Sequence, residues 1–309
     1  MKNSMGYTMR DYQRRICQAT DYIRQHLREN PSLDDIAHAA SFSKFHFHRV
    51  FHALVGETVG QFTRRLRLEK AANWLIFNKH YDITSIAMEL GFSSSQNFAR
   101  AFQKHFGQSP SKFRQLYPNH RSINSKDQNL APWPPVFDVD SIEWANPSTA
   151  TSKNIKVKEM PELHVAYVRY IGWSGPEDTR QAFERLLQWV SPRGLMESGT
   201  FISAYWDNPY ITPRDNLRLD ACITVPKDTE TSGEIRLQTL PRGTYAMYHC
   251  TIRADEFTET WAELILKWLP GIGYNMSGVP IYEIYHNNGY EAPDGKWVVD
   301  MYCPVKPLE

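Results

Sequence analysis

Two internal repeats constrain the fold of this sequence more than any other feature. In the first repeat, residues 33–62 align with residues 83–113 at an offset of 50 to 51, which pairs Phe47 with Phe98. Each copy reads as a short amphipathic helix, a tight turn and a second helix, and this is the helix-turn-helix pattern. The sequence therefore predicts an all-α N-terminal domain that contains two helix-turn-helix units.

The second repeat covers residues 155–309 at an offset near 80. In it, "IKVKEMPELHVAYVRY" (155–170) matches "IRLQTLPRGTYAMYHC" (235–250), and "AFERLLQWV" (182–190) matches "AELILKWLP" (262–270). Each half reads as strand, helix, strand, strand, so the two halves predict a pseudo-twofold α+β domain. Its natural cavity is the groove between the halves.

Charge is divided unevenly between the two repeats. Up to residue 122 there are 18 Lys and Arg against 9 Asp and Glu, a net +9, whereas the rest has 17 against 25, a net −8. A compact basic domain joined to an acidic one indicates that only the first meets a polyanion. Residues 117–153 are rich in Pro, Asn, Ser and Asp and read as a linker. We expect a helical domain at 7–117, a linker at 118–153 and an α+β domain at 154–309.

Nothing in the sequence argues for export or membrane spanning. It has no N-terminal apolar segment, and it lacks a run of about 18 apolar residues. Its four cysteines are scattered and form no CxxC pair, which fits a reducing cytoplasm. We expect a cytoplasmic protein that does not engage a membrane.

Local signals place the parts of the helix-turn-helix units. Ser43 and Ser93 stand where the N-cap of the second helix of each unit is expected. Gly91 supplies the turn of the second copy, and Ser41 occupies that position in the first. The continuous pattern from Val59 to Phe77 predicts a connecting helix that holds the two units at fixed separation. On its polar faces we place Arg64, Arg65, Arg67 and Lys70.

The segment "KFHFHRVFHAL" (44–54) predicts a two-faced helix. Phe47 and Phe51 belong to an apolar stripe, whereas Phe45, His48 and Arg49 lie on another face. His48 and His52 are one turn apart and could chelate a metal, but a closed site needs about three or four ligands and none lies near in sequence. We expect no metal site.

The helical part resembles the DNA-binding domain of the AraC/XylS family of bacterial transcription regulators. The resemblance runs from Tyr7 to Tyr117 and is strongest in "DITSIAMELGFSSSQNFARAFQKHFGQSPSKFR". It implies that one chain inserts two recognition helices into successive major-groove faces, about one turn of DNA apart. The residues implied to face DNA are Phe45, His46, His48 and Arg49 in the first unit, and Ser95, Gln96, Asn97 and Arg100 in the second.

These side chains have chemistry suited to DNA. Arg49 and Arg100 can grip guanine or phosphate, Gln96 can pair with adenine, and Phe45 can contact a thymine methyl group. His48 stands where many family members carry a larger polar side chain, so a phosphate contact is an equal alternative to base reading. The alternative for the two arginines is that they only solubilise surface helices. Phosphate contacts are expected from Ser43, Lys44, Ser93 and Lys104.

The C-terminal part resembles the GyrI-like effector-binding domain. The resemblance rests on "YWDNP", "LRLDACITVP" and "PIYEIY" and covers nearly the whole back half. It implies a small-molecule pocket between the halves, lined by aromatic residues, with a glutamate that would be Glu283. The weaker candidates for this pocket are Tyr167, Tyr170, Trp173, Tyr205, Trp206, Tyr282 and Tyr285.

The repeat gives an independent reason to single out Glu283. At the offset of 80, Tyr285 corresponds to Tyr205, yet Glu283 corresponds to Ser203. In the alternating strand "PIYEIY", Glu283 shares a face with Ile281 and Tyr285, so a carboxylate stands in an apolar row. Such a carboxylate is costly unless it meets a cation. The alternatives are a surface charge on an edge strand or a structural partner of a Lys or Arg. By the same offset, Asp220 and Asp300 are equivalent and are expected to be structural.

The function predicted from these features is that of a ligand-responsive transcription regulator. It would activate genes for efflux or tolerance of the compound it senses. The expected partners are double-stranded DNA, a small effector such as a cationic amphiphile, and RNA polymerase, with no cofactor. The alternative is a small-molecule hydrolase or sequestering protein that uses Glu283. Against an enzyme, the sequence has no GxSxG, HExxH or phosphate-loop motif.

Overall fold

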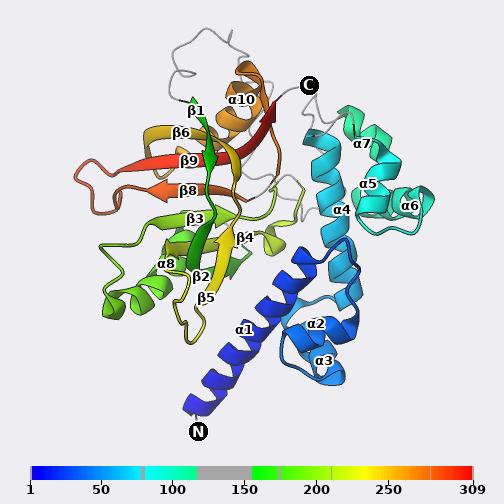
Figure 1. Cartoon of the computed structure of the whole chain (residues 1–309), viewed down its shortest axis with the longest axis horizontal. Coiled ribbons are helices and arrows are strands. Elements are labelled where there is room, and N and C mark those ends of the chain that lie inside the picture. The colour runs from blue at the N-terminus through cyan, green and yellow to red at the C-terminus, as the bar shows by residue number, and fades with distance from the viewer. Residues whose placement is uncertain are drawn as a thin grey trace. The chain divides into compact units, whose positions relative to one another are not determined.

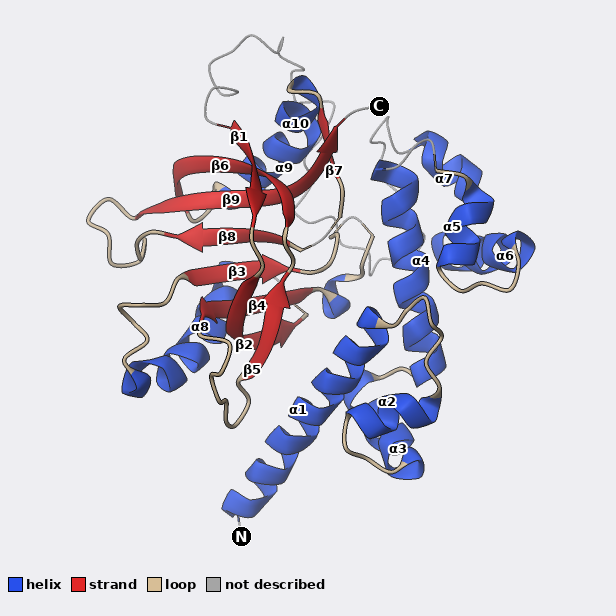
Figure 2. Ribbon diagram, in the orientation of Figure 1, coloured by secondary structure: helices blue, strands red, loops and turns tan. Residues whose placement is uncertain are grey.

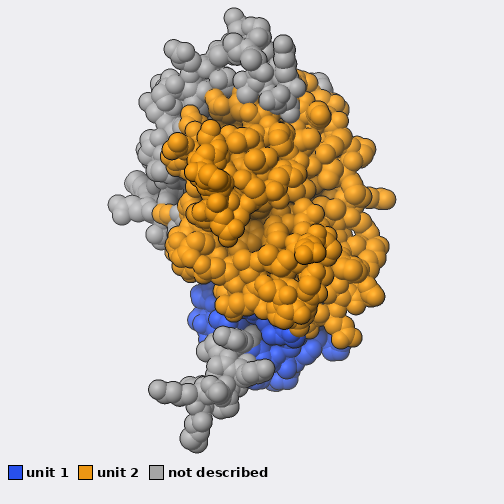
Figure 3. Space-filling model, turned by 90° about the vertical axis from the view of Figure 1, so that its left-hand side faces the viewer, with its two compact units in different colours: residues 1–125, 232–234 blue, residues 126–231, 235–309 orange. Residues whose placement is uncertain are grey.

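The computed structural model divides the chain into two compact units. It describes residues 2–77, 81–116, 155–172, 175–209, 211–278 and 280–307. The N-terminal unit comprises residues 1–125 with 232–234, and the C-terminal unit comprises 126–231 and 235–309 (Figure 3). The predicted linker at 118–153 lies outside the described residues. Within the described part of the chain, no helix is both long and apolar enough to cross a bilayer.

All the regular secondary structure described in the N-terminal unit is helical (Figure 1). Its helices are α1 (Lys2–Gln25), α2 (Leu33–Ala39), α3 (Lys44–Val55), α4 (Val59–Phe77), α5 (Ile83–Glu89), α6 (Ser95–Phe106) and α7 (Pro110–Leu116). The pairs α2–α3 and α5–α6 are the two predicted helix-turn-helix units, and α4 has the predicted bounds. The phenylalanines on the inner faces of α3 and α6 are buried, as expected for core residues: Phe47, Phe51, Phe98, Phe102 and Phe106.

The two helix-turn-helix units share the geometry of the turn between their helices. Ser41 has φ 57° and Gly91 has φ 73°, so both occupy the left-handed region. A serine there costs more than a glycine because its Cβ crowds the backbone. Ser43 is the N-cap of α3, although its side chain makes no capping hydrogen bond. The predicted cap at Ser93 is wrong by one residue, because Ser94 accepts the backbone hydrogen bond from Asn97 at the start of α6.

Two arginines predicted on polar faces of α4 are buried instead. Arg65 is 8% exposed and pairs with Glu57 and Glu69. Arg67 is 9% exposed and donates to the Leu27 carbonyl oxygen at 2.9 Å. The pattern of charged residues along α4 could not reveal these distant partners.

Arg67 also reaches the second helix-turn-helix unit. Its guanidinium donates to the Gly91 carbonyl oxygen at 3.4 Å, and a Cβ added to Gly91 would lie 3.1 Å from Nη2. Through Arg67, α4 therefore joins the chain after α1 to the turn between α5 and α6. This contact supports the prediction that α4 holds the two units at fixed separation.

The C-terminal unit is built around one antiparallel sheet (Figure 2). Its strands are β1 (Ile155–Met160), β2 (Leu163–Ile171), β3 (Phe201–Tyr205), β4 (Arg218–Thr224), β5 (Arg236–Leu240), β6 (Gly243–Arg253), β7 (Tyr274–Met276), β8 (Ile281–Tyr285) and β9 (Lys296–Pro307). Its main helices are α8 (Pro176–Val190) and α9 (Phe257–Glu263), the latter continued by a π-helical turn (Leu264–Trp268) and α10 (Leu269–Gly271).

The order of the strands confirms the pseudo-twofold prediction. It reads β1-β6-β9-β8-β3-β4-β2-β5, and exchanging each strand for its repeat equivalent reverses the order. The axis therefore passes between β3 and β8. One detail of the prediction is wrong, because each half begins with two strands rather than one. Pro161 and Pro241, which lack an amide donor, stand at these breaks.

The break changes how the halves are joined. After β1 the chain leaves the neighbourhood of β6 and continues in β2, which pairs with β4 and β5. Each half thus lends its first strand to the other half. The helix α8 packs on one face of β2 and β4 through Ala182, Leu186 and other apolar residues.

Candidate functional site

The outward face of α3 exposes a large hydrophobic side chain, Phe45. Phe45 is 85% exposed, and His48 and Arg49 on the same helix are also exposed. His46 is half-buried instead, because its ring packs edge-on against Tyr12 with the centroids 5.6 Å apart. The structure thus places three of the four predicted base-facing residues of the first unit on the surface, with His46 partly enclosed.

The outward face of α6 is polar and internally connected. The Asn97 side chain donates to Ser93 Oγ at 2.6 Å and accepts from Arg100 at 2.5 Å. Gln96 is exposed beside them, whereas Ser95 is half-buried. The second unit therefore presents a row of hydrogen-bonding groups where the first presents an aromatic ring.

The predicted phosphate contacts lie at the surface. Ser43 and Lys44 flank the start of α3, and Lys104 is exposed in the last turn of α6. Lys44 forms an exposed ion pair with Asp34 at 2.6 Å. A pair of this kind is worth at most about 1 kcal/mol and is easily exchanged for another anion.

In the C-terminal unit, Glu283 is a buried carboxylate on a central strand. It is 1% exposed, and β8 lies between β9 and β3. Three neutral groups donate to it: Trp261 Nε1 at 2.6 Å, Tyr285 Oη at 2.5 Å and Tyr205 Oη at 3.0 Å. This arrangement excludes a surface charge on an edge strand. Among the described residues no Lys or Arg pairs with Glu283, so the structural ion pair is excluded there as well.

The surroundings of Glu283 oppose its ionisation. Burial raises the pKa of the carboxyl group above its usual value, and the hydrogen bonds from Tyr285, Trp261 and Tyr205 lower it only in part. Burial and the nearby carboxylate also raise the pKa values of Tyr205 and Tyr285 well above the ordinary range. Both phenols therefore remain donors at neutral pH.

Glu283 lies at the pseudo-twofold axis of the domain. Its cross-strand partner on β3 is Ser203, which is also its equivalent in the sequence repeat. The equivalent tyrosines Tyr205 and Tyr285 both reach the carboxylate, and Tyr285 Oη also lies 2.9 Å from Ser203 Oγ. The expected site between the halves thus coincides with a carboxylate that only one half supplies.

Aromatic side chains lead from this carboxylate toward the surface. Tyr285 packs against Phe183 of α8, Phe257 of α9 and Trp297 of β9, with centroids 5.9, 6.4 and 5.2 Å apart. Trp297 in turn contacts Tyr290, which is 55% exposed. Sequence reasoning missed four of these aromatic residues, because none has an aromatic equivalent at the offset of 80: Phe183, Phe257, Trp261 and Trp297. It also missed Tyr290, although the offset pairs that residue with Tyr210.

Several other predicted pocket residues lie elsewhere. Tyr167, Trp206 and Tyr282 belong to the apolar cluster on the opposite face of the sheet, so we do not retain them near Glu283. Tyr170 packs with the cluster under α8 on the same face as Glu283. Trp173 falls outside the described residues.

The two equivalent aspartates have unequal surroundings. Asp220 is fully buried. Its carboxylate accepts hydrogen bonds from Arg169 Nε and Nη2, each at 2.7 Å, and from Trp206 Nε1 at 2.6 Å. Asp300 is partly exposed and contacts two histidine side chains. The structural role expected for Asp220 fits its buried ion pair.

Comparison with known proteins matches both units to families. A family model described as a GyrI-like small molecule binding domain matches residues 153–306, and one described as a helix-turn-helix domain matches residues 36–116. The DNA gyrase inhibitor of Erwinia billingiae is 32% identical over 162 residues, which covers 50% of this chain and 99% of that protein. The DNA gyrase inhibitor of Escherichia coli K12 is 31% identical over 158 residues, covering 50% and 98%.

Solved structures match each unit separately. The C-terminal domain of EcmrR shares 19% identity at a TM-score of 0.41 and covers 50% of this chain and 98% of that one. The DNA-binding domain of AdpA in complex with a target DNA shares 25% identity at a TM-score of 0.32, covering 34% and 95%.

A duplicated helix-turn-helix unit and a small-molecule binding domain in one chain define a ligand-sensing transcription regulator. The C-terminal half of the chain belongs to the GyrI-like family, and the N-terminal half contains a helix-turn-helix domain of the AraC type.

Proposed function

We propose that this regulator senses a cationic, partly aromatic molecule at Glu283. The observation that carries the proposal is a carboxylate that is 1% exposed and has only neutral donors among the described residues. Burying a charge without a countercharge is costly, and neutral hydrogen bonds offset only part of that cost. A cationic effector would supply the missing countercharge.

The aromatic residues beside Glu283 suit the same kind of ligand. A cation is attracted to the face of an aromatic ring, most strongly when both are shielded from water. Phe183, Phe257 and Trp297 surround Tyr285, and the contact with exposed Tyr290 gives an apolar route from the surface. The ligand would enter along these rings and place its charge near the carboxylate.

For the N-terminal unit we propose that α3 and α6 read double-stranded DNA. Arg49 and Arg100 would bind guanine or phosphate, Gln96 would bind adenine, and Phe45 would contact a thymine methyl group. Ser43, Lys44, Ser93 and Lys104 would hold phosphates. The protein would act in the cytoplasm and, through RNA polymerase, activate genes for efflux or tolerance of its effector.

A second candidate is an enzyme or sequestering protein that uses the same carboxylate. The raised pKa of Glu283 favours it, since a general base works best with a pKa near the working pH. We propose that no reaction occurs, because Glu283 accepts three hydrogen bonds and the chain carries two DNA-binding units. Conversion of a bound compound in a single-turnover experiment would establish the enzyme instead.

The experiment that tests the sensor uses Glu283→Gln, which removes the charge and keeps the size. Wild type and variant are titrated with cationic amphiphiles and with neutral analogues of similar shape. Tryptophan fluorescence is the readout because Trp261 donates directly to Glu283. We expect the variant to lose about 1–3 kcal/mol of affinity for the cations, the range for a charge-assisted contact, and much less for the neutral compounds.

The matched control is Glu197→Gln, which removes an exposed carboxylate from the same unit. It should leave both affinities unchanged. Equal binding of the cations by wild type and Glu283→Gln would mean that the site recognises shape alone.

A further inference from the structure

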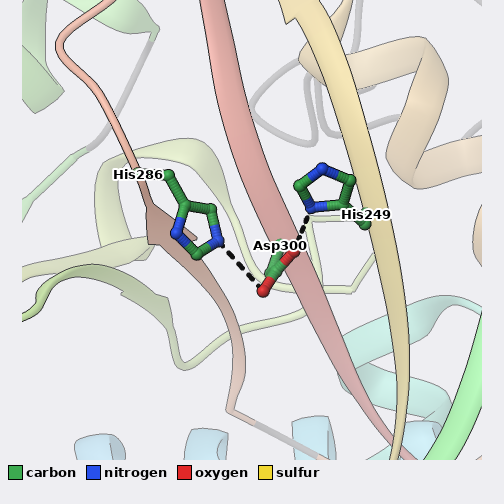
Figure 4. A group of neighbouring side chains, drawn as sticks. All are labelled: His249, His286 and Asp300. Atoms are coloured by element: carbon green, nitrogen blue, oxygen red, sulfur yellow. Dashed lines mark hydrogen bonds and ion pairs between the residues drawn. The ribbon is translucent and has the colours of Figure 1, made fainter.

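A second polar cluster lies on the face of the sheet opposite Glu283. His249 on β6, Asp300 on β9 and His286 directly after β8 come from three neighbouring strands. His249 Nδ1 lies 2.6 Å from Asp300 Oδ1, and His286 Nε2 lies 3.0 Å from Asp300 Oδ2. Figure 4 shows the carboxylate between the two imidazoles. Among the described residues, this is the one group of three or more potential metal ligands that lie close together.

The pseudo-twofold symmetry shows that the fold itself does not require these histidines. At the offset of 80, Asp300 is equivalent to Asp220, His249 to Arg169, and His286 to Trp206. In the first half the aspartate is paired with a permanent cation and with an indole donor that cannot ligate a metal. The second half therefore replaces two groups that only donate hydrogen bonds with two groups that can bind a metal.

From this replacement we propose that His249, His286 and Asp300 bind a divalent first-row transition-metal ion such as Zn²⁺. Two imidazole nitrogens and one carboxylate oxygen form a donor set that such ions accept. His249 and His286 are 55% and 44% exposed, so water can complete the coordination. The site is distinct from Glu283 and does not depend on the proposed effector.

The geometry needs only a small adjustment to accept the ion. Tetrahedral Zn²⁺ with bonds of about 2.0–2.2 Å holds its ligand atoms roughly 3.3–3.6 Å apart. The three ligand atoms here all lie within 4.8 Å of one another. Rotation of the two exposed imidazoles would widen the 2.6 and 3.0 Å contacts enough to admit the metal.

The backbone holds the three ligands in register. His249 and Asp300 are direct cross-strand partners, and the His286 amide donates to the Val298 carbonyl oxygen at 2.9 Å. Ligands on paired strands are held more firmly than ligands on loops. The sheet therefore fixes the relative positions of these residues more firmly than a loop would.

The test measures Zn²⁺ bound by the full chain in equilibrium dialysis. Eight of the eleven histidines lie before residue 122 and can bind ions weakly, so the informative quantity is the difference between wild type and variants. His249→Arg copies the first half by placing a guanidinium beside Asp300, which removes a ligand and preserves the ion pair. His286→Ala removes the other exposed imidazole. Each variant should bind one Zn²⁺ fewer per chain than wild type.

Two controls separate this site from general histidine binding. His164→Ala removes the remaining histidine of the C-terminal unit and should bind as much Zn²⁺ as wild type. Glu283→Gln should also leave Zn²⁺ binding unchanged. Circular dichroism confirms that each variant is folded.

Copper provides an independent readout of the ligands. The electron paramagnetic resonance spectrum of the chain with one equivalent of Cu²⁺ should show coupling to imidazole nitrogens that is lost in His249→Arg/His286→Ala. If wild type and this double variant bind the same amount of Zn²⁺ and give the same Cu²⁺ spectrum, the proposal is wrong.

Discussion

The two helix-turn-helix copies keep an exposed arginine at the same position, whereas the two halves of the sheet domain differ at the equivalent positions Ser203 and Glu283. In the N-terminal unit, Arg49 and Arg100 are exposed at equivalent positions. In the C-terminal unit, Glu283 stands opposite Ser203. A regular polymer such as DNA can be gripped twice by the same device. A ligand on a twofold axis meets both halves at once and needs only one countercharge.

The serine is as informative as the glutamate. Ser203 and Glu283 are direct cross-strand partners, and Ser203 is fully buried. A second glutamate at Ser203 would place two carboxylates side by side, and like charges in that arrangement oppose each other. Asymmetry at this pair therefore avoids a second carboxyl group beside Glu283.

The largest expected effect contrasts the two aspartates. Arg169→Ala leaves Asp220 buried without its cation, and breaking one partner of a buried pair typically costs about 3–5 kcal/mol. His249→Ala breaks a half-exposed contact to Asp300 and should cost less than about 1 kcal/mol in the absence of metal. Urea unfolding followed by tryptophan fluorescence measures both, because eight of the nine tryptophans lie after residue 122. If both variants lost a similar free energy of unfolding, Asp220 and Asp300 would not differ in how strongly their partners stabilise the fold.

A second contrast compares the free energy of unfolding of wild type with that of Glu283→Gln, which carries a neutral amide, as a function of pH. Burial raises the pKa of Glu283 above the ordinary 4.5, so the folded chain holds the proton more tightly than the unfolded chain. The stability contributed by this proton is complete below about pH 4.5 and is lost as the pH rises through the folded-state pKa. The variant has no such proton.

We therefore expect the free energy of unfolding of Glu283→Gln relative to wild type to increase as the pH rises above 4.5, and to level off above the folded-state pKa of Glu283. Urea midpoints between pH 4.5 and 8 measure the difference. Glu197→Gln, an exposed control, should follow wild type at every pH. A constant difference between Glu283→Gln and wild type would show that Glu283 titrates normally.

The sequence was most informative where the signal was periodic or repeated. The bounds of α4, the two helix-turn-helix units and the pseudo-twofold order all follow from local pattern and from an offset. The repeat showed that Glu283 corresponds to Ser203, but only the structure shows that the two are cross-strand partners. These features depend on neighbours in the chain or on symmetry.

Contacts between distant positions could not be predicted in this way. Arg67 appeared solvent-facing because charged residues usually do, yet its partner is the Leu27 carbonyl, which has no side-chain signature. Trp261 on α9 donates a hydrogen bond to Glu283, but its equivalent at the offset of 80 is Gln181, so the repeat did not indicate this contact. His249 and His286 meet only because β6, β9 and β8 are adjacent in the sheet.

A third test asks whether the two helix-turn-helix copies act alike. Arg49→Ala and Arg100→Ala should each lose about 1–3 kcal/mol at a specific site if they read bases, and Gln96→Ala should lose a similar amount. Lys104→Ala should weaken all sequences alike, because a phosphate contact carries no sequence information. DNA fragments selected by the protein provide the site, and fluorescence anisotropy on selected and random DNA gives the affinities. If Gln96→Ala lost affinity equally on both DNAs, Gln96 would be a backbone contact.

The smallest expected effect concerns the turn inside each helix-turn-helix copy. Ser41 and Gly91 share a left-handed backbone, which costs a residue with a Cβ roughly 1–2 kcal/mol. Ser41→Gly removes that strain but also loosens the unfolded chain, which returns about 0.4–1 kcal/mol. The net gain in unfolding free energy should therefore be about 0.5–1 kcal/mol, with the turn still held by the hydrogen bond from Arg15 to the Ser41 carbonyl.

The reciprocal change, Gly91→Ala, should cost at least about 1–2 kcal/mol, because it adds the same strain and brings a methyl group within 3.1 Å of Arg67 Nη2. Urea midpoints of the helical circular dichroism signal measure both changes. A gain in Ser41→Gly and a loss in Gly91→Ala would show that both turns require the same left-handed backbone. A loss of stability in Ser41→Gly would instead mean that the serine side chain itself stabilises the first turn.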